Sequence, residues 1–251
     1  MLRISVAVLA RVLFYHPIHG EMMLALERKA TLLDHEDPPD VAIQIQPFGG
    51  AIRIKNPHAL QEIIGKFHFD SESSRAVQDF RIFIDPTTWP KLHDYCMEHL
   101  SYEADSVLET NPDRELKEEF QDALGIELNP GQFTRKPIGI VLDDGPKNIL
   151  INRKSEHITV RLYRIYEVMI TDPSLARMMM EISDQITHQD LSAAAIKDFQ
   201  NGGKGRANAI LVVPLKIITS LLNSKPVEIQ KALNLPENVK FEDNNFAILK
   251  S

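Results

Sequence analysis

Runs and alternations of apolar residues, each bounded by turn-forming residues, predict a series of β-strands in the first two thirds of this chain. The expected strands are residues 4–13, 22–26, 41–46, 80–84, 137–142, 148–152 and 157–170. Pro17 and Gly20 predict a hairpin between the first two strands, and residues 143–146 predict a further turn. After the third strand, Gly49 and Gly50 indicate either a tight turn or a close approach of two backbones.

Apolar residues that recur three and four positions apart predict helices with one buried face. The expected helices are residues 59–66, 88–100, 112–124, 173–186, 191–199, 215–222 and 227–233. Asp172 before Pro173 is a typical helix start. Residues 71–74 are expected to form a polar loop, and the last third of the chain is expected to be helical.

This order of elements predicts an α+β protein with a mixed sheet. Residues 1–170 are expected to form one unit, with a self-contained insertion over about residues 56–109. Residues 171–251 are expected to form a helical C-terminal extension that packs on the same core. A chain of 251 residues is long enough to bury such a core.

One short helix carries the clearest candidate chemistry. Asn111 is expected to cap it, Pro112 to occupy its first position and Gly125 to end it. Helical spacing separates an apolar stripe from a neighbouring acidic arc. The stripe holds Leu116, Phe120, Ala123 and Leu124, and the arc holds Glu115, Glu118, Glu119 and Asp122.

The acidic arc has two interpretations. It can be a solvated helix face, although like charges four positions apart cost a surface helix roughly 0.2 to 0.5 kcal/mol per pair. Alternatively, the carboxylates share a divalent cation, because Mg²⁺ and Mn²⁺ prefer oxygen ligands and cancel the repulsion.

Composition narrows the possible partners. A net charge of −7 argues against nonspecific binding to nucleic acid or to an anionic membrane. The single Cys96 excludes an internal disulfide framework and fits a reducing compartment, so a cytoplasmic location is expected. Arg11 interrupts the apolar N-terminus, which is interpreted as a buried strand and not as a signal peptide. No uninterrupted apolar run is long enough for a membrane span.

The acidic helix reads Arg114-Glu115-Leu116-Lys117-Glu118-Glu119, which matches the R-E-U-x-E-E core of the Nudix box, G-x5-E-x7-R-E-U-x-E-E-x-G-U, with U a bulky aliphatic residue. Together with the preceding strands and glycines, it resembles the Nudix superfamily. The resemblance covers roughly residues 2–170 and implies an α/β/α sandwich, a divalent metal and hydrolysis of a pyrophosphate bond in a nucleoside diphosphate derivative. It implies Glu115, Glu118 and Glu119 as metal ligands, with Arg114 orienting a carboxylate.

The chain also departs from that box. Gly49 and Gly50, counted here among the substrate-binding residues, lie about 50 residues further from Arg114 than the motif places its glycine. Ser106 stands at the position of the box acid, so that Glu109 or Glu103 has to reach the same space. Gln121 and Asp122 replace the closing pair, with Gly125 and Ile126 as a displaced helix end. Glu109 and Glu167 are the candidate general bases.

Two further groups are candidates for substrate contacts. Residues 201–206 form a glycine-rich loop in which Lys204 and Arg206 can hold a phosphate, unless the loop is only a helix connector. On the last long strand, Arg161 and Arg164 suit a phosphate and Tyr163 and Tyr166 suit a base, unless these residues are the wet face of a sheet.

The function expected from these features is a Nudix-type hydrolase that uses Mg²⁺ or Mn²⁺ and acts on a small nucleotide-like molecule. The first alternative is a Nudix-like nucleotide-binding or regulatory module that has lost catalysis, which the altered box favours. The second is an interaction protein whose acidic helix is only surface. A second copy of the chain is a candidate partner.

Overall fold

The computed structural model describes residues 1–33, 39–143, 158–221, 226–233, 235–236, 238–242 and 248–249. Its strands are β1 (Leu2–Tyr15), β2 (Met22–Leu32), β3 (Val41–Gln46), β4 (Phe48–Ala51), β5 (His68–Phe69), β6 (Arg81–Ile84), β7 (Phe133–Asp143), β8 (Thr159–Ile170), β9 (Arg206–Pro214) and β10 (Val239–Phe241). Its α-helices are α1 (Pro57–Ile64), α2 (Glu72–Val77), α3 (Trp89–His99), α4 (Asp113–Leu124), α5 (Pro173–Gln185), α6 (His188–Gln200), α7 (Leu215–Ser220) and α8 (Pro226–Ala232), with short 3-10 turns at Pro86–Thr88 and Pro130–Gln132.

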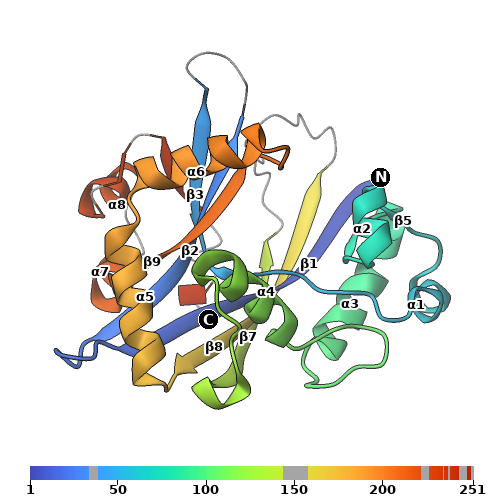
Figure 1. Cartoon of the computed structure of the whole chain (residues 1–251). Coiled ribbons are helices and arrows are strands. Elements are labelled where there is room, and N and C mark those ends of the chain that lie inside the picture. The colour runs from blue at the N-terminus through green and yellow to red at the C-terminus, as the bar shows by residue number, and fades with distance from the viewer. Residues whose placement is uncertain are drawn as a thin grey trace.

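These strands form one mixed ten-stranded sheet in the described part of the chain. The pairs β1 with β8 and β3 with β10 are parallel, and the remaining pairs are antiparallel. In Figure 1, α4 lies in front of the sheet, between α5 and α6 on one side and the segment containing α1, α2 and α3 on the other. The protein is therefore of the α+β class with a mixed open sheet.

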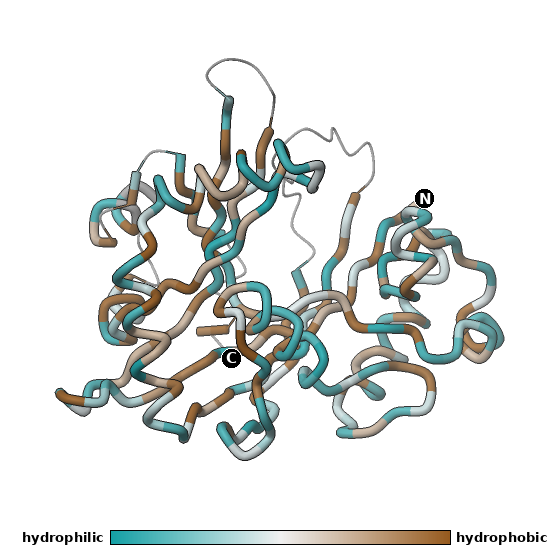
Figure 2. The backbone as a smooth tube through the Cα atoms, viewed as in Figure 1, coloured by the Kyte–Doolittle hydropathy of each residue, from teal (hydrophilic) through white to brown (hydrophobic). Residues whose placement is uncertain are grey.

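Apolar residues pack against both faces of the sheet, and the tube coloured by hydropathy shows them running along the strands (Figure 2). One core receives α1, α3, α4 and α5 through Leu60, Leu92, Leu116 and Leu175. The other receives α6 and α7 through Leu191 and Ile218. Because strand side chains alternate between faces, β1 supplies Val6 and Val8 to the first core and Ala7 and Leu9 to the second.

The sheet splits next to its first hairpin. β1 and β2 pair only near their shared turn, from Val12 with Ala25 to Tyr15 with Met22. Further along, β1 pairs with β4, whereas β2 pairs with β3. Only Pro47 separates β3 from β4, so the chain crosses from one side of the split to the other there. The result is two wings, β8-β1-β4 and β9-β2-β3, with an opening between them.

Most of the predicted elements are present. The hairpin between the first two strands is confirmed, as are the third strand and the helix that begins after Asp172, whose carboxylate accepts the Ser174 N–H at 2.8 Å. The helix at 113–124 ends at Gly125, which has φ 70°, as predicted. Its start differs by one residue because Pro112 takes the cap position. The Oδ1 of Asn111 accepts the Asp113 N–H at 3.3 Å.

Two predictions were wrong. The polar loop at 71–74 contains the start of α2, for which Ser71 accepts the Ser74 N–H. The last third is not helical throughout, because β9 pairs with β2 from Met23 opposite Pro214 to Thr31 opposite Arg206, and β10 pairs with β3.

The predicted strand at 148–152 and the turn residues 144–146 lie outside the described residues. None of the helices in the described part of the chain has the length and apolar character needed to cross a membrane.

Candidate functional site

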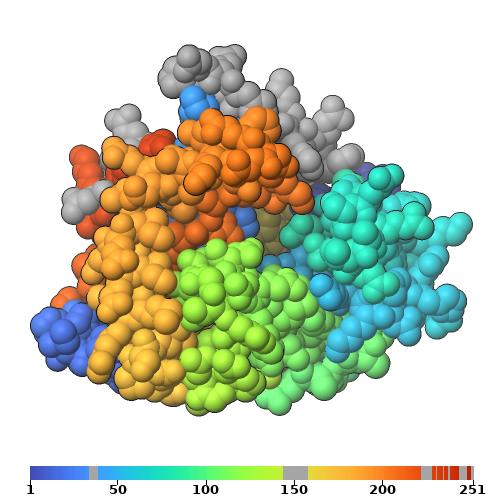
Figure 3. All heavy atoms as spheres, in the orientation of Figure 1, coloured from blue at the N-terminus to red at the C-terminus, as the bar shows by residue number. Residues whose placement is uncertain are grey.

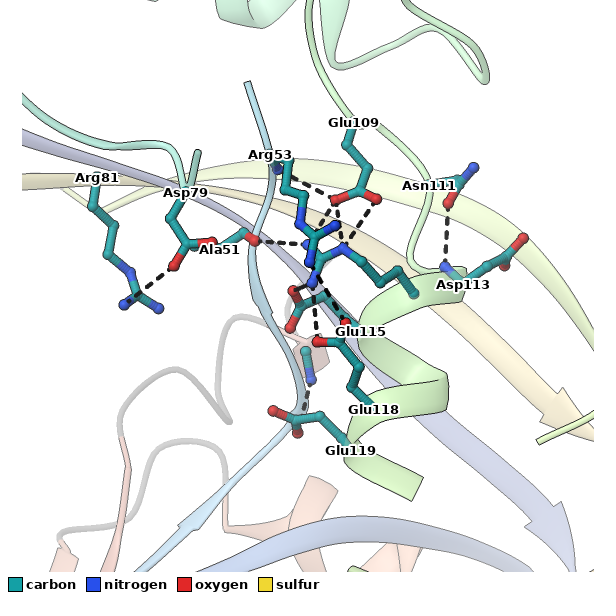
Figure 4. Close-up of polar contacts among 12 residues, drawn as sticks. Ala51, Arg53, Asp79, Arg81, Glu109, Asn111, Asp113, Glu115, Glu118 and Glu119 are labelled. Atoms are coloured by element: carbon teal, nitrogen blue, oxygen red, sulfur yellow. Dashed lines mark hydrogen bonds and ion pairs between the residues drawn. The ribbon is translucent and has the colours of Figure 1, made fainter. Parts of the chain in front are cut away.

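The acidic face of α4 is fixed by the burial of its apolar face. Leu116 and Phe120 are fully buried, and the Phe120 ring lies 4.9 Å from the ring of Phe48 on β4. This contact holds α4 against β4 across the opening of the sheet. Figure 4 shows Glu115, Glu118 and Glu119 projecting from α4 beside the strand that carries Ala51.

The two glycines of β4 allow this close approach. A Cβ added to Gly50 would collide with the Glu115 carboxylate, and one added to Gly49 would collide with the backbone of Val8 on β1. Gly49 also has φ +134°, a conformation that L side chains rarely adopt. Of the two interpretations of these glycines, close approach is therefore confirmed, and the tight turn was wrong because both residues lie in a strand.

Arg114 links the carboxylates of the site. Its guanidinium pairs with both Glu109 oxygens, with Nη2 at 2.6 Å from Oε2, and its Nη1 lies 2.5 Å from Glu115 Oε1 and 3.0 Å from Glu118 Oε2. Nη2 also donates to the Ala51 carbonyl at 3.2 Å. Glu109 in turn accepts the Arg53 N–H at 3.3 Å (Figure 4). Such planar, two-pronged pairing fixes orientation as well as charge.

A pocket of about 520 Å³ opens beside this network. The wing β8-β1-β4 contributes Leu9 and Tyr163, and the wing β9-β2-β3 contributes Lys29, Gln44 and Gln46. The acidic and basic residues that line it are Lys29, Arg53, Asp79, Arg81, Arg114, Glu115, Glu118 and Glu119. Figure 3 shows a hollow where α4 (green), α6 (orange) and the segment that contains α2 (cyan) meet. Glu115, Glu118 and Glu119 of the acidic arc therefore line a polar pocket and are not only exposed surface.

Burial shifts the protonation of the site carboxylates. Burial raises the pKa of Glu115 above its usual value, although Arg114 opposes the shift. Burial and the neighbouring Glu27 raise the pKa of Glu119 further, against Lys29 and the Gly49 N–H. Burial alone would lower the pKa of Arg114, but Glu109, Glu115 and Glu118 raise it overall, so this arginine stays charged. Shifts of this kind are typical of functional sites, although structural ion pairs also produce them.

The donor chemistry of the site suits a hard divalent cation. Glu27 is fully buried, and its Oε1 accepts no hydrogen bond, which leaves an uncompensated oxygen beside Glu119. A cation would compensate it. In the described residues, however, no three acidic, histidine or cysteine side chains converge as a metal site. Glu115 and Glu118 form ion pairs with Arg114, and Glu119 accepts a hydrogen bond from the Gly49 N–H at 3.3 Å.

Of the candidates on the long strand β8, only Tyr163 lines the pocket, and Arg161, Arg164 and Tyr166 do not. Arg164 is buried and donates to the carbonyls of Tyr102 and Thr110, and Tyr166 also donates to Thr110, so both hold the loop before α4. Arg161 pairs with Asp143 at 3.7 Å and does not line the pocket, whereas Tyr163 does.

Glu167, one of the two candidate bases, is also outside the pocket. It pairs with Arg11 at 2.5 Å and with Lys136 at 2.7 Å, and hydrogen bonds from Lys136 and Arg11 lower its pKa despite partial burial. The other candidate, Glu109, is bound on both oxygens by Arg114.

The glycine-rich loop connects α6 to β9, and an internal carboxylate fills its backbone nest. Asp198 Oδ2 accepts the N–H of Gly205 at 2.9 Å and of Arg206 at 3.2 Å. The side chains of Lys204 and Arg206 line a second pocket of about 420 Å³. Any phosphate at this loop would therefore contact these side chains and not the nest.

Sequence reasoning missed the cations Lys29, Arg53 and Arg81. Each lies in or beside a strand, and only the splitting of the sheet brings the three to one pocket. Lys29 carried one signal, since it belongs to the charged run Glu27-Arg28-Lys29 that interrupts the apolar residues of β2.

Comparison of this chain with protein-family models, with curated proteins and with solved structures gives no match.

Proposed function

We propose that this protein is a Nudix-like hydrolase that cleaves a pyrophosphate bond in a nucleoside diphosphate derivative with Mg²⁺ or Mn²⁺. In this proposal the helices on both faces of the sheet correspond to an α/β/α sandwich with an insertion and a C-terminal extension. One observation carries it: Glu115, Glu118 and Glu119 share a single pocket with Lys29, Arg53 and Arg81. Carboxylates suit a divalent cation, and the cations beside them suit phosphate oxygens.

Each charged group has a role in this proposal. Lys29, Arg53 and Arg81 bind and orient the phosphate groups, while Arg114 positions Glu115 and Glu118. When bound, the metal would neutralise charge on the phosphate oxygens and lower the pKa of a water molecule. Asp79 pairs with Arg81 at 3.6 Å and keeps that arginine oriented along the pocket wall.

The pairing of Arg114 with Glu109 supports the resemblance where the sequence departs from it. Ser106 stands at the position of the box acid and cannot form an ion pair with the helix arginine. Glu109, three residues later, occupies both Nε and Nη2 of Arg114. A carboxylate from the loop before the helix thus reaches the arginine despite the long insertion, which assigns Glu109 a positioning role and not that of the base.

The second candidate function is a nucleotide-binding module without turnover. The observation in its favour is that Glu115 and Glu118 lie on Arg114 and do not converge with Glu119 on one point. Small displacements are costly, since a misplacement of about 1 Å can reduce a rate by about 100-fold. Both functions require the pocket to bind a nucleotide.

Turnover of a panel of nucleoside diphosphate derivatives with Mg²⁺ and with Mn²⁺ tests the proposal. We expect the wild type to release a phosphorylated product, and Glu118→Gln and Glu119→Gln each to lower kcat by about 100-fold or more. Glu127→Gln, which removes an exposed carboxylate just beyond α4, is the matched control and should leave kcat unchanged.

Equal turnover in all variants would remove the hydrolase assignment. Nucleotide binding by calorimetry without turnover in the wild type would favour the binding module. Absence of binding to every nucleotide tested would contradict both functions.

A further inference from the structure

A second pocket lies next to the candidate active site. Its lining has more cationic than acidic side chains, whereas the first pocket has equal numbers of the two. It is formed where the α6–β9 loop meets β2, and its charged and amide lining consists of Lys29, Asp122, Asp198, Lys204, Arg206 and Asn208. Its volume of about 420 Å³ is comparable to that of the first pocket. Three cationic side chains and two acidic side chains therefore line this pocket.

Lys29 lines both pockets, so the two pockets are adjacent. On β2 it is directly opposite Asn208 of β9, the strand that follows the loop carrying Lys204 and Arg206. A ligand with anionic groups in both pockets would have to run past this lysine.

The charges of the second pocket are available to an anion. Asp198 is already committed to the loop, because its Oδ2 accepts the Gly205 and Arg206 N–H groups. In the described part of the chain, Lys29, Lys204 and Arg206 form no ion pair with an acidic residue. Asp122, on α4, is the other acidic residue that lines the pocket, and its carboxylate does not bind this loop. The net charge of the free side chains is positive, in a chain whose overall charge is −7.

From these observations we propose that Lys29, Lys204 and Arg206 form a second phosphate subsite, which holds a phosphate group of the substrate beyond the bond that is cleaved. The proposal rests on the proposed function for the identity of the first pocket. The substrate class it indicates has a phosphate chain longer than a diphosphate.

Binding without metal tests the subsite separately from catalysis. The ligand is inorganic tripolyphosphate, measured by calorimetry with the full chain in the presence of EDTA, with inorganic phosphate as a second probe. We expect the double variant Lys204→Gln/Arg206→Gln to weaken tripolyphosphate binding by about tenfold or more, because it removes two charge-assisted hydrogen bonds to the phosphate. Both side chains are exposed, so the fold should be retained.

The matched control is Lys66→Gln/Lys91→Gln, which removes the same charge from exposed positions in the inserted segment. It should change tripolyphosphate affinity by less than about twofold. Equal weakening in the control pair, or less than about twofold weakening in the Lys204/Arg206 pair, would overturn the subsite.

Two further binding measurements show whether the bound phosphate belongs to the substrate or is free phosphate. If the subsite belongs to the substrate, nucleoside triphosphate should lose affinity in the Lys204/Arg206 variant while nucleoside monophosphate keeps it. Loss of inorganic phosphate binding alone, with unchanged triphosphate affinity, would overturn the assignment to the substrate. Loss of tripolyphosphate binding in a protein that shows no turnover would leave the subsite standing and the hydrolase proposal contradicted.

Discussion

At the scale of single residues, Glu119 is where the stability of the fold and the proposed chemistry conflict. Its partly buried carboxylate lies beside fully buried Glu27, and its pKa is raised by burial and by that neighbour. Two carboxylates so placed repel each other when both are ionised, and no described cation forms an ion pair with either. A site that holds a divalent cation tolerates this arrangement, because the cation supplies the missing charge.

Glu119→Gln should stabilise the metal-free protein, and the effect should depend on pH. Below the ordinary glutamate pKa of 4.5, Glu119 is protonated in both the folded and the unfolded chain and carries no penalty. As the pH rises above 4.5 towards the raised pKa, the unfolded chain releases the proton first, so the folded state loses stability. Glutamine cannot ionise. The free energy of unfolding in urea with EDTA should therefore be higher for the variant at pH 7, with a smaller difference at pH 4.

Glu127→Gln serves as the control for this measurement and should match the wild type at both pH values. A Glu119→Gln protein that is less stable than the wild type at pH 7, or a difference of the same size at both pH values, would contradict a pKa of Glu119 that burial and the neighbouring Glu27 raise.

At the scale of elements, the contact of β4 with α4 decides whether the carboxylates lie at the pocket. Gly49 approaches the backbone of β1 and Gly50 approaches the side chain of Glu115. The backbone cannot yield at Gly49, whereas at Gly50 a side chain can move. The two neighbouring glycines should therefore respond differently to the same added methyl group.

Gly49→Ala should destabilise the fold by about 2 to 4 kcal/mol, since it meets the Val8 backbone and has φ +134°. Gly50→Ala should cost only about 1 kcal/mol but should abolish turnover, because the added carbon displaces the Glu115 carboxylate. Gly131→Ala, which meets nothing within 4 Å, is the control. Urea unfolding and kcat measured on all three variants check the pattern, and normal turnover in Gly50→Ala would contradict it.

Local signals made the first hairpin and α4 predictable, because Pro17, Gly20 and Gly125 mark their ends and apolar spacing marks their faces. Strand β9 was missed because a short apolar run does not distinguish a buried strand from a buried helix. α2 was missed because six residues are too few to show a helical period. The α4 carboxylates were visible in the sequence, but Lys29, Arg53 and Arg81 were not, since their convergence depends on the split sheet.

At the scale of the whole molecule, segments from distant parts of the chain assemble the candidate site. Residues 56–109 supply Asp79 and Arg81 to the first pocket, α4 supplies the carboxylates, and residues 171–251 supply Lys204 and Arg206 to the second pocket. The last of these segments also supplies β9, which pairs along most of β2 and so fixes Lys29 beside both pockets. Three segments that are far apart in the sequence therefore contribute side chains to the two pockets.

A titration with Mn²⁺ tests most directly whether the α4 carboxylates hold a divalent cation. Calorimetry on the full chain should detect Mn²⁺ binding to the wild type that Glu118→Gln and Glu119→Gln each weaken by about tenfold or more, since each removes an anionic oxygen ligand. Glu127→Gln should bind as the wild type does. Equal Mn²⁺ affinity in all four proteins, or none in the wild type, would contradict a metal-dependent site on α4.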